Sequence, residues 1–349
     1  MKLTGGRLLM GGGIVVALIA GAGLLIHSPE LHHAIGGLHS AAHLHPDGPA
    51  AQVVGAQTGD PAANERAIAG VARIGRQWNE TAFRETVALY TDVHQGIEWP
   101  GVQAARIVRY GDAPQQTFEL YLPEQEFSEP GPVFLFLHGN GLGNFDRHAA
   151  GSNGLIFSHL GKLAATAGGI GISMNYRGPD ALNDSGAIAS LEAIEPGAAD
   201  LRSVIEWIIG NIEAYGGDPG TIVLSGNSEG ATVAAAYLFN ENWQMASGHG
   251  IAAAIFSSGL FGSRAPQIED LVDDYDGRSV PLALWSGEFD VPEIANGTHA
   301  LHELLCEKYD KCPFLERFPG HNQLSYLMSL GTADTVAMNA FIGFYHTVR

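Results

Sequence analysis

The 349-residue sequence predicts an α/β fold in which a mostly parallel sheet is covered by helices on both faces. From Pro132 onward, short continuous apolar segments alternate with segments of helix length. Continuous apolar strands are typical of a parallel sheet, because both of its faces are buried. Hydrophobic residues make up 46% of the chain and glycine supplies 46 positions. This composition excludes disorder throughout the chain and fits a packed domain.

The expected strands and helices follow in order along the chain. Two short strands, which could form a hairpin, precede six apolar strands: 105–110, 117–122, 133–137, 169–174, 221–224, 252–256, 282–285 and 314–318. The helices expected among them are 157–167, 199–215, 230–240, 295–309 and 332–347. Upstream, apolar residues at helical spacing from Ile68 to Tyr90 predict one or two amphipathic helices, and residues 67–100 could form a cap. The acidic stretch 262–280 is expected to be a solvated loop, with a calcium site as the alternative.

The first 26 residues have the pattern of a membrane or signal segment. Lys2 and Arg7 precede an uncharged run over residues 8–26, which is long enough to span a membrane. Ala20-Gly21-Ala22 also fits the small-residue pattern of a signal-peptide cleavage site. A cleaved signal peptide and a signal anchor both remain open, and both place the rest of the chain outside the cytoplasm. If the segment is a signal anchor, residues 8–26 attach the protein to the membrane.

Residues 27–66 are predicted to be a linker, because they contain four prolines and no sustained apolar period. Six of the 15 histidines lie there, at positions 27, 32, 33, 39, 43 and 45. A polar linker accounts for them, and metal capture is the alternative. The formal charge of the whole chain is −19, which argues against a nucleic-acid partner. The catalytic domain is then expected over residues 67–349.

A candidate nucleophile follows the expected strand at 221–224. The sequence Gly226-Asn-Ser-Glu-Gly230 leads from that strand into a helix, which is the arrangement of a nucleophile elbow. Two glycines allow a tight turn that exposes the hydroxyl of Ser228 at the edge of the sheet. The alternative is a glycine-rich turn with a serine near a helix N-cap. The context favours Ser228 as the nucleophile.

A second turn is a candidate for stabilising an oxyanion. His138-Gly-Asn-Gly141 follows the expected strand at 133–137, where such a turn supplies backbone N–H donors. The predicted donors are the main-chain N–H groups of Gly139, Asn140, Gly141 and Glu229, the last being the residue after the nucleophile.

A serine nucleophile also needs a histidine as base and an acid to orient it. In the required chain order the acid follows the serine, and the histidine comes last. Asp290 follows the strand at 282–285 and His321 follows the strand at 314–318. Both positions lie at the carboxyl edge of a parallel sheet, where ligands bind. Glu288 and Glu293 are close alternatives for the acid, and a structural histidine is the alternative for His321. The predicted triad is Ser228, Asp290 and His321.

These motifs together resemble those of an α/β-hydrolase esterase over residues 105–349, with carboxylesterase, feruloyl-esterase-like and hormone-sensitive-lipase-like members the most similar. Further segments that carry the resemblance are 110–123, 175–177 and Tyr215-Gly-Gly-Asp-Pro219. The resemblance implies an α/β-hydrolase fold, a small-molecule ester substrate, an acyl-enzyme mechanism, and no metal or organic cofactor. An amidase or peptidase on the same fold and a catalytically silent binding protein remain alternatives.

Two residues depart from the family pattern. Asn140 stands where the family tetrad usually has glycine, and Glu229 stands where the residue after the nucleophile is usually small. A carboxylate there would oppose a developing oxyanion, so we expect the side chain of Glu229 to face a polar partner outside the pocket.

The only two cysteines, Cys306 and Cys312, lie six residues apart between an expected helix and an expected strand. Export favours a disulfide between them, and two free thiols are the alternative.

Overall fold

The computed structural model describes residues 59–140, 146–178, 188, 190–265, 267–277, 279–309 and 311–345. The expected signal or anchor segment at 1–26, most of the expected linker and Gly141 lie outside these residues. In the part of the chain that is described, no helix is long and apolar enough to cross a membrane.

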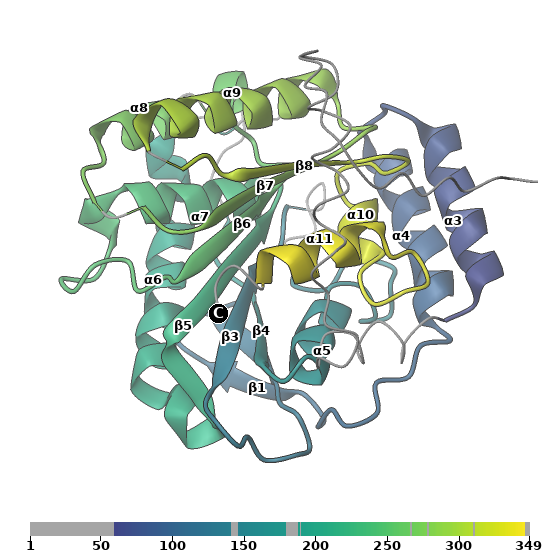
Figure 1. The fold of residues 1–349 in the computed structure, drawn as a ribbon, viewed down its shortest axis with the longest axis horizontal. Helices are drawn as coiled ribbons and strands as arrows, with labels where there is room; N and C mark the ends of the chain where they lie inside the picture. Colours follow the sequence, from purple (N-terminus) through teal and green to yellow (C-terminus); the bar gives the residue numbers. More distant parts are fainter. Residues whose placement is uncertain are drawn as a thin grey trace, which may run out of the picture. The chain divides into compact units, whose positions relative to one another are not determined.

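Eight strands among the described residues form one sheet (Figure 1). They are β1 (Arg106–Arg109), β2 (Thr117–Tyr121), β3 (Gly131–Leu137), β4 (Ile170–Met174), β5 (Gly217–Asn227), β6 (Ala253–Ser257), β7 (Leu282–Gly287) and β8 (Phe314–Phe318). Their order is β1-β2-β4-β3-β5-β6-β7-β8. The first two pair antiparallel with each other and β2 pairs antiparallel with β4, whereas β3 to β8 run parallel. The predicted mostly parallel sheet is therefore confirmed.

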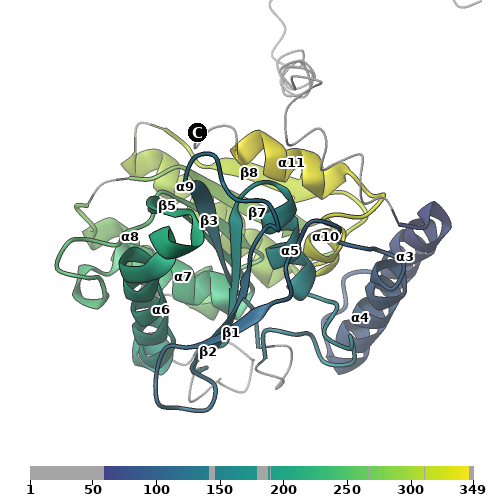
Figure 2. The ribbon, with the colours of Figure 1, turned by 90° about the horizontal axis from the view of Figure 1, so that it is seen from below.

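Helices cover both faces of this sheet. They are α3 (Pro61–Ile74), α4 (Glu80–His94), α5 (Ser158–Thr166), α6 (Leu191–Asn211), α7 (Glu229–Phe239), α8 (Gln267–Asp274), α9 (Pro292–Lys308), α10 (Ser325–Met328) and α11 (Val336–Tyr345). Figure 2 shows α6 and α5 on opposite sides of β3 and β4. Along β3, Val133 and Leu135 face the apolar cluster that includes α6 to α9, and Phe134 and Phe136 face the cluster that includes α3 to α5, α10 and α11. The continuous apolar strand thus supplies a core on each face.

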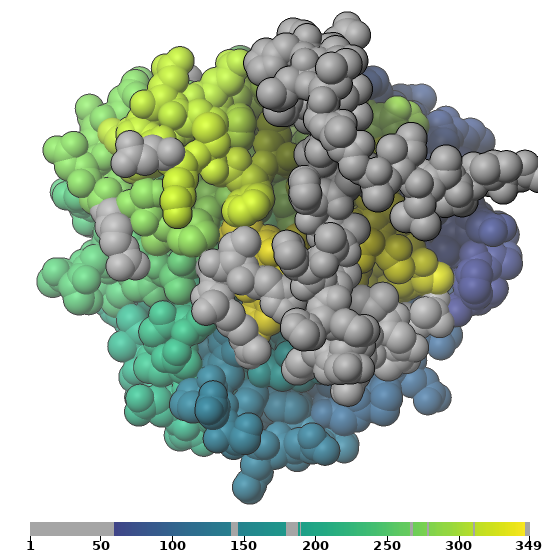
Figure 3. Space-filling view, in the orientation of Figure 1, coloured from purple at the N-terminus to yellow at the C-terminus, as the bar shows by residue number. Residues whose placement is uncertain are grey.

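The helices upstream of the sheet extend beyond the predicted range from Ile68 to Tyr90, since α3 starts earlier and α4 ends at His94. Helix α3 begins at Pro61, within residues expected to belong to the linker. The side chain of Asp60 accepts a hydrogen bond from the backbone of Ala62 at 2.9 Å, and Pro61 occupies the first turn, where its missing N–H costs nothing. Helices α3 and α4 form a hairpin along one flank of the domain, coloured purple to blue (Figures 1 and 3).

The acidic stretch was expected to be a solvated loop, and this expectation is wrong over α8. Ile268 and Val272 are four residues apart and almost fully buried, so one face of α8 packs against the core. Asp270, Asp273 and Asp274 are exposed, whereas Glu269 is half-buried and accepts the backbone N–H of Gly262. Charge alone does not prevent a helix when its apolar residues recur at helical spacing.

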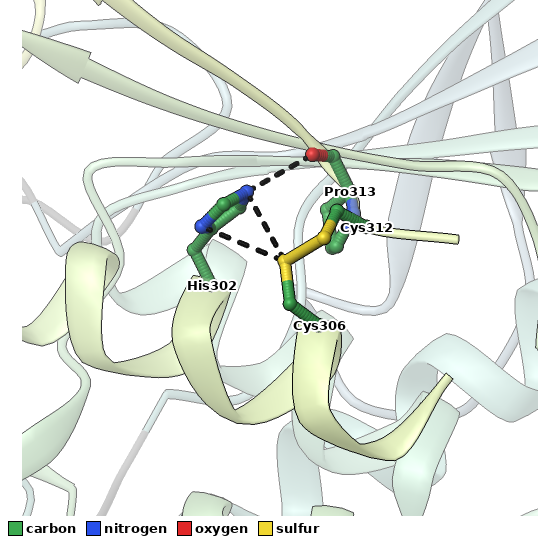
Figure 4. Close-up of a disulfide and its surroundings, with 4 residues drawn as sticks. All are labelled: His302, Cys306, Cys312 and Pro313. Carbon is green, nitrogen blue, oxygen red and sulfur yellow. Dashed lines mark hydrogen bonds between the residues drawn. A yellow bond between two sulfur atoms is a disulfide. The ribbon is translucent and has the colours of Figure 1, made fainter. Parts of the chain in front are cut away.

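Cys306 and Cys312 are joined by a disulfide that links the last turn of α9 to the chain just before β8 (Figure 4). His302 lies one turn before Cys306, with its Nε2 3.1 Å from the carbonyl oxygen of Pro313. Within the described residues, His302 and the two cysteines are also the group of side chains that comes close enough to hold a metal ion. The sulfur atoms of Cys306 and Cys312 are, however, bonded to each other in the disulfide.

Candidate active site

Ser228 lies in a sharp turn between β5 and α7. Its φ of 53° and ψ of −120° are a strained conformation for a residue with a side chain. A Cβ atom added to Gly226 would lie 2.5 Å from the carbonyl oxygen of Gly230, and one added to Gly230 would lie 2.4 Å from that of Leu137. Both glycines are therefore required for the close approach of strand and helix. The backbone N–H of Ser228 donates to Ser257 at the end of β6, which fixes the turn against the neighbouring strand.

The turn after β3 packs directly on this serine. A Cβ atom added to Gly139 would lie 2.9 Å from Cβ of Ser228, so only glycine fits there. The preceding His138 is fully buried, and its carbonyl oxygen accepts a hydrogen bond of 2.5 Å from the phenol of Tyr176. Burial lowers the pKa of His138 to about 4, which keeps the ring neutral at physiological pH. The predicted oxyanion turn and the nucleophile are therefore adjacent.

The two residues that depart from the family pattern contact each other. Glu229 is 1% exposed, and its side chain is hydrogen-bonded to that of Asn140. Burial raises the pKa of Glu229 to about 8, although the bond from Asn140 opposes the shift. The side chain at this position is thus an uncharged acid at neutral pH, and it does not place a negative charge beside an oxyanion.

His321 lies in the loop after β8 and is 2% exposed. Its Nδ1 is 3.0 Å from the hydroxyl of Ser325, and its Nε2 is 2.9 Å from a carboxylate oxygen of Asp334. Neither nitrogen is hydrogen-bonded to Ser228 in this conformation. The loop is nevertheless held next to the elbow, because the side-chain amide of Asn227 donates to the carbonyl oxygen of Gln323 at 2.9 Å.

Asp290 lies in the loop after β7, at the edge that the sequence predicts, and is 1% exposed. Its Oδ2 accepts a hydrogen bond of 2.7 Å from Ser258, whose hydroxyl also lies 2.7 Å from that of Tyr326. Burial raises the pKa of Asp290 to about 7, against the lowering effect of the Ser258 bond. The acid and base loops are joined through their backbones, since the N–H of Phe289 donates to the carbonyl oxygen of His321. The structure does not bring the carboxyl group of Asp290 to the imidazole.

Sequence reasoning missed Asp334 and Ser325 as partners of His321. Asp334 comes after the histidine in the chain, whereas the expected order places the acid before it. The signal that could have found it is local: Asp334 precedes the apolar helix α11, and its Oδ1 accepts from the backbone N–H of Val336 at 3.1 Å. An aspartate at a helix start is read first as a cap, which hides a second role.

Comparisons with known proteins show what this chain is similar to. Residues 116–267 match the model of the Carboxylesterase family, a span that includes the oxyanion turn and Ser228 but ends before Asp290 and His321. A probable isoprenylcysteine alpha-carbonyl methylesterase of Oryza sativa subsp. japonica is 30% identical over 204 residues, which are 57% of this chain and 45% of that protein. Phenmedipham hydrolase of Pseudarthrobacter oxydans is 31% identical over 159 residues, 43% of this chain and 29% of that protein. The chain therefore spans less than half the length of these two relatives.

Solved structures extend the likeness over most of the fold. Esterase B of Lactobacillus rhamnosis superimposes with a TM-score of 0.56 at 14% identity, covering 77% of this chain and 95% of that one. A bacterial heroin esterase superimposes with a TM-score of 0.54 at 16% identity, covering 84% of this chain and 98% of that one. The structures show that this chain has the fold of the esterases with which it superimposes. The family model and the relatives show that its sequence is similar to that of carboxylic ester hydrolases.

Proposed function

We propose that this protein hydrolyses carboxylic esters through an acyl-enzyme on Ser228. The observation that carries the proposal is the strained turn at Ser228, packed against Gly139 of the oxyanion turn. A positive φ at a residue other than glycine costs about 1–3 kcal/mol, and such strain is concentrated at functional sites. A serine held there by two indispensable glycines is the arrangement that a nucleophile requires.

The reaction follows from the placement of the loops. The hydroxyl oxygen of Ser228 attacks the ester carbonyl carbon while His321 takes its proton. The main-chain N–H groups of Gly139, Asn140, Gly141 and Glu229 stabilise the oxyanion. The protonated imidazole then gives its proton to the departing alcohol, and water releases the acid by the same steps in reverse.

His321 reorients during this cycle, because in the described conformation its nitrogens face Ser325 and Asp334. Catalytic hydrogen bonds are often absent in a free enzyme and form only with substrate bound. The chain order assigns the supporting acid to Asp290. Neither step uses a metal ion or an organic cofactor.

We further propose that the enzyme acts outside the cytoplasm, either secreted, periplasmic or attached through residues 8–26. The disulfide between Cys306 and Cys312 supports an oxidising compartment. Mass measurement of the mature protein tests the form of export: an amino terminus near Gly23 means a cleaved signal peptide, and an intact Met1 in a membrane fraction means an anchor.

Small neutral esters are the proposed substrates. The formal charge of −19 disfavours the approach of anionic esters at low ionic strength. The name of one relative describes a methylesterase and that of the other a hydrolase, which is consistent with ester substrates. A matched pair of p-nitrophenyl ester and anilide separates esterase from amidase activity.

The decisive experiment is Ser228→Ala with a fluorophosphonate probe and a p-nitrophenyl ester. Wild type should be labelled and active, and the variant should lose both properties while keeping its circular dichroism spectrum. Ser203→Ala is the matched control, since that hydroxyl lies on the exposed side of α6 and bonds only the carbonyl oxygen of Ala199. An unlabelled wild type would favour a silent binding protein instead.

A further inference from the structure

The imidazole of His321 has a buried carboxylate partner that the chain order does not predict. Its Nε2 lies 2.9 Å from Oδ2 of Asp334, and the two side chains are 2% and 4% exposed. At this distance and burial, an ionised carboxylate interacts strongly with a protonated imidazole, because little solvent screens the pair.

Asp334 is positioned to be ionised. Its other carboxylate oxygen, Oδ1, accepts the backbone N–H of Val336 at the amino terminus of α11. Helix amino termini favour negative charge. Burial alone would raise the pKa of Asp334, but the bond and charge of His321 and the N–H of Val336 lower it below the usual value.

The environment of Asp290 raises the pKa of its carboxyl group, whereas that of Asp334 lowers it. Its Oδ2 accepts a hydrogen bond from the hydroxyl of Ser258, which in turn contacts Tyr326. The backbone of Gly287 and the charges of Arg317 and Arg76 also lower its pKa, but burial outweighs them. Burial raises the pKa of Asp290 to about 7. A carboxyl group with a pKa near 7 is only partly ionised at neutral pH, so it is a weaker partner for an imidazolium than Asp334.

The remaining groups around the pair come from other elements. Tyr90 of α4 is fully buried, and the negative charge of Asp334 adds to burial in raising its pKa. Ser325 of α10 faces the other imidazole nitrogen at 3.0 Å. Neither residue carries a charge at neutral pH, and the carboxylate of Glu288 accepts the backbone N–H of Gly320 at 2.8 Å. Asp334 is therefore the carboxylate that contacts the imidazole itself.

We propose that Asp334 is the positioning residue that holds His321 in the free enzyme and stabilises its protonated form there, whereas the carboxyl group of Asp290 is bonded to Ser258 in this conformation. This inference rests on the proposed function in one respect, namely that His321 is the catalytic base.

The test compares Asp334→Asn with Asp290→Asn in the full chain. Both substitutions replace a carboxyl group by an uncharged amide of nearly equal size, and asparagine at 334 keeps an oxygen acceptor for Val336. The titration of His321 is followed by NMR of its imidazole. In Asp334→Asn the midpoint should fall by at least about one pH unit, since a close opposite charge shifts an imidazole by that amount. In Asp290→Asn it should stay within a few tenths of a unit.

A kinetic readout runs beside the titration. The acid limb of kcat/KM reports protonation of the free enzyme, so it should move to lower pH in Asp334→Asn by the same amount. Asp334→Ser repeats the experiment with a hydroxyl cap for α11 in case the asparagine variant folds poorly. A shifted midpoint in Asp290→Asn together with an unshifted one in both Asp334 variants would overturn the proposal. If wild type hydrolyses no ester, the proposed function fails, while the NMR titration still decides which carboxylate holds His321.

Discussion

The side-chain amide of Asn322 donates a hydrogen bond of 2.9 Å to the hydroxyl of Thr86 and so joins helix α4 to the loop that carries His321. The other end of the same amide organises the loop, because its Oδ1 accepts from the backbone N–H groups of Leu324 and Ser325. Arg76, just after α3, also reaches the carbonyl oxygen of Asp290 at 3.5 Å. The helical hairpin thus contacts both the acid loop and the base loop. It is part of the structure that positions the candidate catalytic residues.

Thr86→Val should therefore lower both stability and activity. Valine keeps the shape of threonine but leaves the buried Asn322 amide without its acceptor, which costs about 1–3 kcal/mol. We expect kcat/KM to fall with it, since the base loop loses an anchor. Denaturant unfolding and ester hydrolysis measure the two effects. Thr91→Val is the matched control: its hydroxyl is also buried and also bonds the carbonyl four residues back, but it does not touch the base loop. Equal losses in the two variants would mean that the contact with Asn322 has no special role.

Glu229→Gln should change the pH dependence of the reaction. The pKa of Glu229 is raised by burial to about 8, so its carboxyl group is uncharged below that pH and ionised above it. Ionisation places a negative charge one residue from Ser228, which opposes the oxyanion. Wild type should lose kcat/KM as the pH rises above 8, and the variant should retain it, while the two should agree near pH 6. Glu241→Gln, an exposed substitution just beyond α7, should follow wild type throughout. Parallel profiles for wild type and Glu229→Gln would show that Glu229 does not act on the reaction centre.

The sheet and its carboxyl edge could be predicted from the sequence, because continuous apolar strands and turn glycines are local signals. Ser228, Asp290 and His321 each lie after the strand that the prediction names. What could not be predicted is where the side chains point. The carboxyl group of Asp290 is drawn to Ser258 after β6, and His321 to Asp334 before α11. These pairs join different elements, so no spacing along the chain reveals them. The contact between Thr86 and Asn322 spans 236 residues and is equally hidden.

Removing the disulfide with Cys306→Ser and Cys312→Ser together should destabilise the protein without changing its catalysis. Closing so short a loop contributes about 2 kcal/mol in the chain-entropy model. The bridge joins α9 to the start of β8, away from the side chains that surround Ser228. Denaturant unfolding should show the loss in the double variant, and a reductant should lower the stability of wild type only. An unchanged midpoint would mean that packing alone fixes this loop, and a large fall in kcat/KM would mean that β8 needs the bridge to place His321.

Two buried histidines should make the protein sensitive to acid. His94 of α4 and His159 of α5 are in contact, with ring centroids 4.4 Å apart and the rings tilted by 42°. Their Nε2 atoms lie 2.7 and 3.0 Å from the carbonyl oxygens of Met328 and Leu327. The Nδ1 of His159 accepts the backbone N–H of Phe157, so this ring is the neutral tautomer with its proton on Nε2. Burial lowers the pKa of His94 from 6.5 to about 4, and that of His159 well below 6.5.

The unfolded chain binds protons at these histidines more readily than the folded one does. Their contribution to the free energy of unfolding is therefore fully present above pH 6.5 and is lost as the pH falls towards 4. His94→Gln should lower the free energy of unfolding at pH 7, because it removes a ring from the core, yet flatten its decline on acidification. The slope of the free energy of unfolding against pH should decrease by up to about 1.4 kcal/mol per pH unit, which corresponds to the uptake of one proton. Urea unfolding at several pH values between 7 and 4 measures it. His299→Gln, whose side chain is 63% exposed on α9, should keep the wild-type slope. If the slope of His94→Gln also equals that of wild type, then His94 is protonated in the folded protein as readily as in the unfolded chain, and the carbonyl oxygens of α10 must accommodate its charge.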